Sequence, residues 1–161
     1  MGELSTVLFT LLLGITPISE LRGAIPYAFF NGIPLVTSAL LGCLSNLLVY
    51  PLVSFFLNIF HSFFYARIGF YRRFFDHTIA RIRHKVESKV TLYGMVGVTL
   101  FVAIPFPVTG AYSGTLGSWV LGLDKRKSFL AVSIGVLIST IIVTVVLFLG
   151  NGAYSIWIKQ V

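Results

Sequence analysis

Residues 16–23 read TPISELRG, and this polar stretch separates two short apolar segments. The preceding segment, Leu4–Ile15, has 12 residues, whereas a helix needs about 20 to cross the bilayer core. Residues 105–110 read PFPVTG and interrupt a second short apolar segment in the same way. Because proline lacks the amide hydrogen that a helix ladder requires, each break predicts a helical hairpin, and the pattern occurs twice.

The composition indicates that the bilayer is the solvent of this chain. Of its 161 residues, 57% are hydrophobic and 11% are charged, and the mean hydropathy is +0.94. A soluble domain has about 25% charged residues, so a water-soluble fold of this size could not hide so much apolar surface. The composition also excludes a disordered chain, a coiled coil and a disulfide scaffold, and the single Cys43 leaves no disulfide or cysteine-based metal site.

The order of the apolar segments predicts one membrane domain over residues 1–161, built from two similar halves. The expected fold is all-α and integral to the membrane. Each half has a re-entrant or short helical hairpin followed by a long transmembrane helix, and a basic amphipathic helix lies between the halves. Because the halves would enter from opposite faces, they form an inverted-topology repeat, as in many secondary transporters. The expected segments are a first repeat 1–60 (hairpin 4–30, transmembrane helix 33–60), the basic helix 61–89, a second repeat 90–150 (hairpin 90–122, transmembrane helix 128–150) and a tail 151–161.

Basic residues gather in two clusters, which predict the orientation in the membrane. Seven of the twelve Lys and Arg residues lie between Arg67 and Lys89, and three more lie at 125–127. The positive-inside rule places such clusters in the cytoplasm, which predicts a multi-pass protein of the cell membrane with both termini extracytoplasmic. Residues 61–89 also carry an apolar stripe at helical spacing, which suits an anionic leaflet and an ordinary surface helix equally well. The net charge of +7 comes without a zinc motif or recognition module, so we expect no nucleic-acid partner.

The two long helices carry small or polar residues at corresponding positions, separated by 93 residues. Small residues let helix backbones approach closely in a membrane. Asn46 and Asn58 could each form an interhelical hydrogen bond rather than a ligand contact. The expected packing positions are Ser38, Gly42, Asn46, Gly114, Ala131, Gly135 and Ser139.

Glu20 and Arg22 are the candidate functional charges. They are the only charged residues between Glu3 and Arg67, and a charge within the bilayer costs at least about 2.5–3.5 kcal/mol, so it normally marks function. A carboxylate there can exchange protons or attract a cation, and a guanidinium suits phosphate or carboxylate recognition. The structural alternative is a Glu20–Arg22 pair, or a Glu20 held by backbone amides at a helix start.

Two breaks in corresponding positions indicate a shared site, because irregular backbone within a membrane is tolerated only when it is buried or lines a wet cavity. A simple loop between two spanning helices is the alternative for the second break. The three histidines lack metal-ligand spacing and no nucleophile–base pair is found, so we expect no metal, no cofactor and no enzymatic activity. The candidate transport or substrate-binding residues are Pro17, Glu20, Arg22, Gly23, Pro26, Pro105, Pro107, Thr109, Gly110, Tyr112 and Ser113.

The two breaks resemble those of a known family. PISELRGAIP at residues 17–26 and PFPVTGAYSG at residues 105–114 resemble the small multidrug export protein family, which is similar to the wider DedA (SNARE-associated, VTT-domain) superfamily. The resemblance covers nearly the whole chain and implies two re-entrant hairpins in an inverted repeat. The likeness to DedA proteins implies proton-linked lipid transport, such as the return of polyprenyl phosphate carriers, or lipid scrambling, with Glu20 and Arg22 as functional charges of the first hairpin.

The sequence thus predicts a small proton-coupled membrane transporter with a midplane site formed by the two hairpins. Its substrate would be an amphiphile, either a lipid phosphate carrier or a hydrophobic drug-like molecule. Glu20 would couple protons, and Arg22 would hold an anionic group or tune Glu20. The alternative is a non-transporting interaction or assembly protein that docks through its basic helix. The expected partners are membrane lipid, the substrate, protons and a second copy in a homodimer, since two short hairpins give little wall for a cavity.

Overall fold

Helices make up all the regular structure in the part of the chain that the computed structural model describes, residues 2–74, 76–77, 90–106 and 108–158. Two stretches, Leu35–Arg67 and Lys125–Asn151, are long and apolar enough to cross a membrane. The prediction of an all-helical chain with two long spans is confirmed. The helices are α1 Glu3–Ile15, α2 Glu20–Phe30, α3 Leu35–Leu47, α4 Val49–Arg67, α5 Gly69–Phe74, α7 Val90–Ala103, α8 Ala111–Val120 and α9 Lys125–Ile158.

The first long span is divided in two, which differs from the single helix expected over 33–60. α3 ends at Leu47 and α4 begins at Val49. Pro51 explains the division, because its ring has no amide hydrogen for the carbonyl of Leu47 and would collide with that carbonyl in a straight helix. The span then continues to Arg67 rather than ending near residue 60.

The same turn follows the second hairpin helix in each half. After α2, the amides of Gly32 and Ile33 return to carbonyls of the last turn, and after α8 the amides of Gly122 and Leu123 do the same, with N···O distances of 3.0–3.1 Å. Gly32 and Gly122 have φ values of +91° and +71°, which glycine adopts without strain. Both turns are Schellman motifs, so each hairpin is joined to its long helix by equivalent local structure.

α9 begins three residues earlier than the expected span because Asp124 caps it. The Oδ2 of Asp124 accepts the backbone N–H of Arg126 at 3.1 Å and that of Lys127 at 3.4 Å. A carboxylate at this position also interacts favourably with the positive end of the helix dipole. At its other end α9 continues as far as Ile158, through most of the expected tail.

Of the basic helix expected over 61–89, residues 75 and 78–89 lie outside the described residues. Its first residues belong to the end of α4. Ile68 has extended backbone, with φ −118° and ψ 102°, and it separates α4 from the short α5. In the described part, the expected single helix is therefore interrupted where Gly69 follows Ile68.

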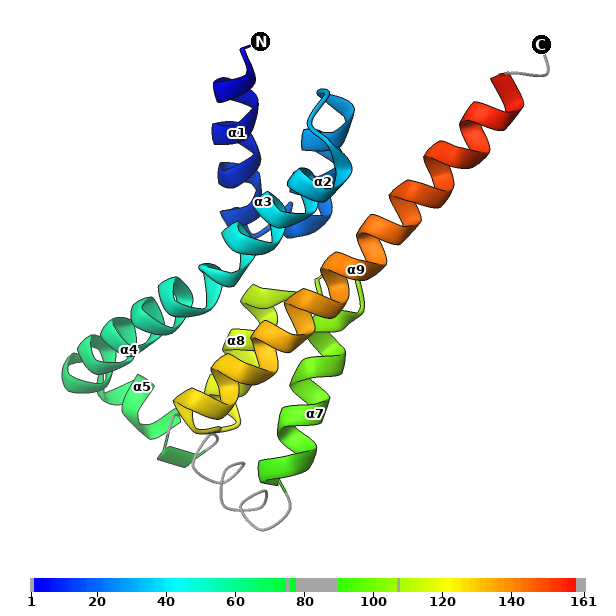
Figure 1. The fold of residues 1–161 in the computed structure, drawn as a ribbon. Helices are drawn as coiled ribbons and strands as arrows, with labels where there is room; N and C mark the ends of the chain where they lie inside the picture. Colours follow the sequence, from blue (N-terminus) through cyan, green and yellow to red (C-terminus); the bar gives the residue numbers. More distant parts are fainter. Residues whose placement is uncertain (1, 75, 78–89, 107, 159–161) are drawn as a thin grey trace.

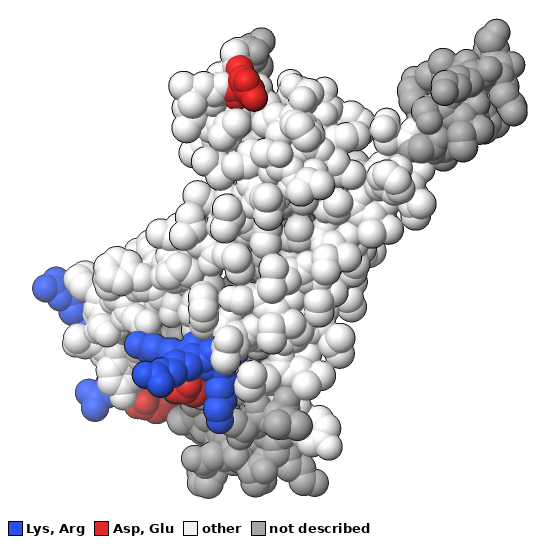
Figure 2. Space-filling model, in the orientation of Figure 1, with Lys and Arg blue, Asp and Glu red and all other residues white. Residues whose placement is uncertain are grey.

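The helices pack as two groups (Figure 1). α1 and α2 pack against each other and against α3, whereas α7 and α8 pack against each other and against α9. Contacts of α3 with α9 and of α4 with α8 join the groups. α1 begins and α9 ends at one end of the molecule, and the Lys and Arg side chains on the face in Figure 2 gather at the opposite end.

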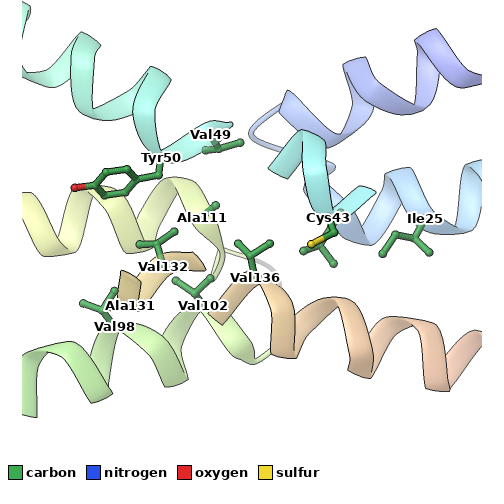
Figure 3. Close-up of a cluster of buried hydrophobic side chains, with 11 residues drawn as sticks. Ile25, Cys43, Val49, Tyr50, Val98, Val102, Ala111, Ala131, Val132 and Val136 are labelled. Carbon is green, nitrogen blue, oxygen red and sulfur yellow. The ribbon is translucent and has the colours of Figure 1, made fainter. Parts of the chain in front are cut away.

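Small and polar side chains fill much of the interior, while large apolar ones cover the outside. Side chains such as Phe55 (69% exposed) and Phe148 (68% exposed) point outward. An apolar cluster that includes Val102, Val132 and Val136 lies between the groups (Figure 3). This distribution suits helices that pack through small residues and face lipid. The buried polar residues include Thr10, Ser38, Asn46, Ser118 and Ser139, each at most 1% exposed.

Two of the expected packing glycines allow close helix contact. A Cβ at Gly42 of α3 would collide with Ile25 of α2, and a Cβ at Gly135 of α9 would collide with Val102 of α7. The partner is the second hairpin helix in one half and the first in the other, so the offset of 93 residues does not extend to the packing partners. The remaining expected positions, Ser38, Asn46, Gly114, Ala131 and Ser139, are all buried.

Candidate functional site between the two helix breaks

Glu20, the first residue of α2, reaches the start of α8. Its Oε1 accepts the backbone N–H of Tyr112 at 3.2 Å, and its side chain is 7% exposed. Gly110 leaves room for this contact, because a Cβ there would collide with the carboxylate. A helix start has unpaired N–H groups and partial positive charge, and α8 has no hydrogen-bonded side-chain cap from its own N-cap residue. Glu20 therefore caps α8 from the other break.

Arg22 holds carbonyl groups of the second break. Its Nη1 donates to the carbonyl oxygen of Phe106, and its Nη2 donates to that of Thr109. Nη2 also lies 3.3 Å from Thr109 Oγ1 and 3.7 Å from Glu20 Oε2. The planar guanidinium suits this role, since its N–H groups point in fixed directions to several acceptors at once. Glu20 thus has both structural contacts considered from the sequence, the ion pair with Arg22 and the amide at a helix start.

The second break also supports the first. The hydroxyl of Tyr112 donates to the carbonyl oxygen of Ile15, in the last turn of α1. Within the second break, Thr109 Oγ1 donates to the carbonyl oxygen of Ile104 at 2.6 Å. Each break thus contributes hydrogen bonds to backbone groups of the other. Such pairing is the condition for irregular backbone in a membrane protein.

The other candidate residues lie around this contact or beside it. Pro17 lies in the first break, and Ser113 follows Tyr112 on α8, with its Oγ 3.4 Å from the carbonyl oxygen of Gly110. Pro26 lies inside α2, and Gly23 packs against Ser19, so both shape the first hairpin. Pro105 forms part of the second break, and Pro107 lies outside the described residues. The candidates in contact across the breaks are Glu20, Arg22, Thr109, Gly110 and Tyr112.

A cavity of about 620 Å³ lies at the junction of the breaks. Its polar lining comes from Glu20, Arg22 and polar residues at the second break and the start of α8, and its apolar lining comes from α4, α8 and both breaks. This combination of apolar walls with a few convergent polar groups is typical of small-molecule sites. The lining residues are Pro17, Ile18, Glu20, Arg22, Val53, Leu57, Val108, Thr109, Tyr112, Ser113 and Leu116.

The apolar lining is the part of the site that the sequence did not reveal. Val53 and Leu57 lie on α4 and look like any other residues of an apolar span. Pro51 is the one signal that marks this region, because it divides the span just before them. Val108 has φ +77°, a conformation that is strained for a β-branched residue. Such strain is concentrated at functional sites.

The negative charge of Glu20 and the positive charge of Arg22 compensate each other within the site. Burial removes water from the Glu20 carboxylate, which disfavours its charge, whereas the Tyr112 amide and Arg22 favour it. In the described parts of the chain, no group of three His, Cys, Asp or Glu side chains could hold a metal ion.

The apolar spans, the two contacting breaks and the buried Glu20 paired with the half-buried Arg22 define a small helical membrane protein. The chain belongs to the family described as "Putative small multi-drug export protein", whose model matches residues 20–142. The matched range includes both charges and the whole second break. Comparisons with curated proteins and with solved structures find no match. The family expected from the two motifs is confirmed, while the relation to the DedA superfamily stays a prediction.

Proposed function

We propose that the protein is a small integral-membrane transporter that couples proton exchange at Glu20 to the movement of an amphiphilic substrate. The observation that carries this proposal is a buried carboxylate that both lines a cavity and caps a helix across the two breaks. A proton or a substrate that changes the state of this side chain changes the contact between the breaks. The family description supports export as the class of function.

Protonation of Glu20 would couple the site to the fold. A carboxylate accepts hydrogen bonds at both oxygens, whereas a carboxylic acid loses its charge and gains an O–H donor. The neutral acid no longer balances Arg22, and it binds the start of α8 more weakly because the charge–dipole attraction is gone. We therefore expect proton binding to loosen the two breaks and proton release to bring them together again.

An inverted repeat that places the breaks near the middle of the bilayer fits these contacts. Support comes from the equivalent turns at Gly32 and Gly122 and from the reciprocal contacts between the breaks. α1 starts where α9 ends, and cationic side chains gather at the opposite end. By the positive-inside rule, that cationic end would face the cytoplasm.

The cavity chemistry supports an amphiphile as substrate. Val53, Leu57 and Leu116 suit a hydrophobic body, and the Glu20–Arg22 pair suits a polar head group. A lipid phosphate would have to replace the carbonyl oxygens of Phe106 and Thr109 as the hydrogen-bond acceptors of Arg22. A drug-like molecule could instead contact Glu20. The transport experiment therefore uses one substrate of each class. A second copy of the chain, which would complete the cavity wall, is part of the same proposal and is tested by crosslinking in lipid.

Proteoliposomes with an imposed pH gradient test the transport proposal. Purified protein is reconstituted, and uptake is followed for a fluorescent hydrophobic dye and for a labelled polyprenyl phosphate. We expect proton-driven flux of at least one of them, and at least a tenfold loss in Glu20→Gln, which keeps the shape but cannot carry the proton. Glu3→Gln is the matched control, because Glu3 is an exposed acid in the first turn of α1, and it should transport normally.

Absence of flux in the wild-type protein, for both substrates, would overturn the proposal. The result expected for an interaction or assembly protein is then binding of the intact protein's basic surface to anionic vesicles, with no flux. Incubation with labelled lipid should return the lipid unchanged, since a transporter forms no covalent product.

A further inference from the structure

Two residues that line the cavity are exposed apolar side chains at the tips of the breaks. Ile18, in the first break, is 99% exposed, and Val108, in the second break, is 88% exposed. The lining residues of α4, Val53 and Leu57, are only partly exposed. Ile18 and Val108 therefore mark the side on which the cavity is open.

A pair of rings closes the cavity toward the cationic end of the molecule. Leu57 on α4 and Leu116 on α8 line the cavity. One helical turn further along these helices lie His61 and Trp119. Their rings meet edge to face, with centroids 5.3 Å apart. The space between α4 and α8 therefore ends at this contact.

Hydrogen bonds between the breaks close the cavity at its other end. Glu20 accepts the backbone N–H of Tyr112 at 3.2 Å, and the Tyr112 hydroxyl donates to the carbonyl oxygen of Ile15. With both ends closed, the side that remains open is the one between Ile18 and Val108.

The lengths of the first helix in each hairpin indicate what this open side faces. α1 has 13 residues and α7 has 14, so each is about 20 Å long at 1.5 Å per residue. The two helices run toward each other from opposite ends of the molecule, and the breaks follow at their inner ends (Figure 1). In a hydrocarbon core of about 30 Å, both tips would lie in hydrocarbon, which is the environment that exposed apolar side chains favour.

We propose that the cavity opens sideways into the lipid, between Ile18 and Val108, and that the substrate enters from the bilayer rather than from water. The substrate is then an amphiphile that is already dissolved in the membrane. Its hydrocarbon body passes between the two tips and packs on the apolar residues of α4, and its polar group reaches Glu20 and Arg22. This inference rests on the proposed transport function and adds the route by which the substrate arrives.

Photolabelling of the whole protein in lipid nanodiscs tests this route. One sample contains a phospholipid with a diazirine in its acyl chain, the other a water-soluble, membrane-impermeant diazirine, and mass spectrometry maps the adducts to residues. We expect the ratio of lipid to water adducts at Leu57 to match that at the exposed Phe55 of the same helix and to exceed that at the exposed Lys127 at least fivefold. Val136 is 0% exposed and should be labelled by neither probe.

Variants of the rim test whether lipid reaches Leu57 through the proposed opening. A larger side chain in Ile18→Trp or Val108→Trp should narrow the opening. We expect lipid labelling of Leu57 to fall at least threefold in these variants, while that of Phe55 stays unchanged. Val36→Trp is the matched control, because Val36 is an apolar residue that is 71% exposed and does not line the cavity. It should leave the labelling of both residues unchanged.

The outcomes separate this inference from the proposed function. Labelling of Leu57 mainly by the water-soluble probe, or by neither probe, overturns the sideways opening but leaves proton-coupled transport intact. Lipid labelling that is unchanged in both rim variants, or lowered equally by Val36→Trp, overturns it as well. The expected labelling together with no flux in proteoliposomes overturns transport and retains a cavity that is open to lipid.

Discussion

Glu20 and Arg22 each form hydrogen bonds that support the fold, and each also lines the cavity. Glu20 caps α8, and Arg22 binds the carbonyls of Phe106 and Thr109, while both side chains line the same cavity. Hydrogen bonds to charged groups contribute about 1.5–3 kcal/mol each. A substitution at either residue therefore changes stability as well as the site, and the two effects have to be measured separately.

Arg22→Lys should destabilise the protein although it keeps the positive charge. An ammonium group cannot reach several acceptors in the fixed fork of a guanidinium, so at least one break carbonyl loses its donor. We expect a loss of about 1.5–3 kcal/mol in the free energy of unfolding, measured by thermal unfolding in detergent. Arg73→Lys, at an exposed position, is the control and should unfold like the wild type. Equal melting temperatures of Arg22→Lys and wild type would contradict the contacts described.

Gly110→Ala should separate the two breaks. The added Cβ would collide with the Glu20 carboxylate, and the φ of +145° is unfavourable for alanine. We expect a loss of at least about 1–3 kcal/mol, the usual cost of a strained backbone. Gly117→Ala is the matched control on α8, because nothing lies within 4 Å of its added Cβ, and it should be neutral or stabilise the helix by up to about 1 kcal/mol.

The sequence predicts which residues are exceptional but not what they contact. Glu20 and Arg22 are recognisable because charges are rare in such an apolar stretch. Their partners lie 84–92 residues away, and many of these are backbone atoms, which no sequence pattern identifies. Asn46 is a polar residue in an apolar span, and the packing of α3 on α2 that helps to bury it does not follow from the sequence.

At the scale of elements, the sequence predicts the turns and caps at several helix ends better than it predicts the division of the first long span. The turns at Gly32 and Gly122 and the cap at Asp124 follow from residue types with known preferences. The division at Leu48 is harder to predict, because proline in the first turn of a helix is common and in the middle of a span is disruptive. Pro51 lies within an uncharged, apolar run from residue 33 to residue 60, so the sequence does not show whether a helix begins near Pro51 or is disrupted there.

Asp124→Ala should destabilise the start of α9. The amides of Arg126 and Lys127 lose their acceptor, which typically costs about 1 kcal/mol. Thermal unfolding in detergent measures this change. Asp124→Asn should recover most of the loss, since asparagine also caps helices well. An alanine variant as stable as the wild type would show that the cap does not contribute to the folded state.

At the scale of the whole molecule, the distribution of charge and apolar surface predicts the orientation. The Lys and Arg side chains on the face in Figure 2 lie at one end, and α1 begins and α9 ends at the other. The order of hairpin and long helix is visible in the apolar segments, whereas the contact between the two groups of helices is not. That contact depends on close approaches such as Gly135 to Val102, which only the packed structure reveals.

Cysteine labelling in intact cells tests the orientation. In a Cys43→Ser background, we expect Gly2→Cys to react with a membrane-impermeant maleimide from outside. Lys127→Cys should react only after the cells are permeabilised, because the positive-inside rule places it in the cytoplasm. The wild-type chain is the control, since Cys43 is 8% exposed and should stay unlabelled. Reaction of both engineered cysteines from the same side would contradict the proposed topology.

The reciprocal contacts between the breaks also predict how the proposed transporter would open. Each contact relies on the others, because Arg22 secures the loop that positions α8, and Tyr112 of α8 secures the end of α1. A half-open intermediate would leave bare peptide dipoles facing hydrocarbon, so its population should be vanishingly small. Opening should then be cooperative and all-or-none, and single-molecule fluorescence would record abrupt jumps between two levels rather than gradual drift.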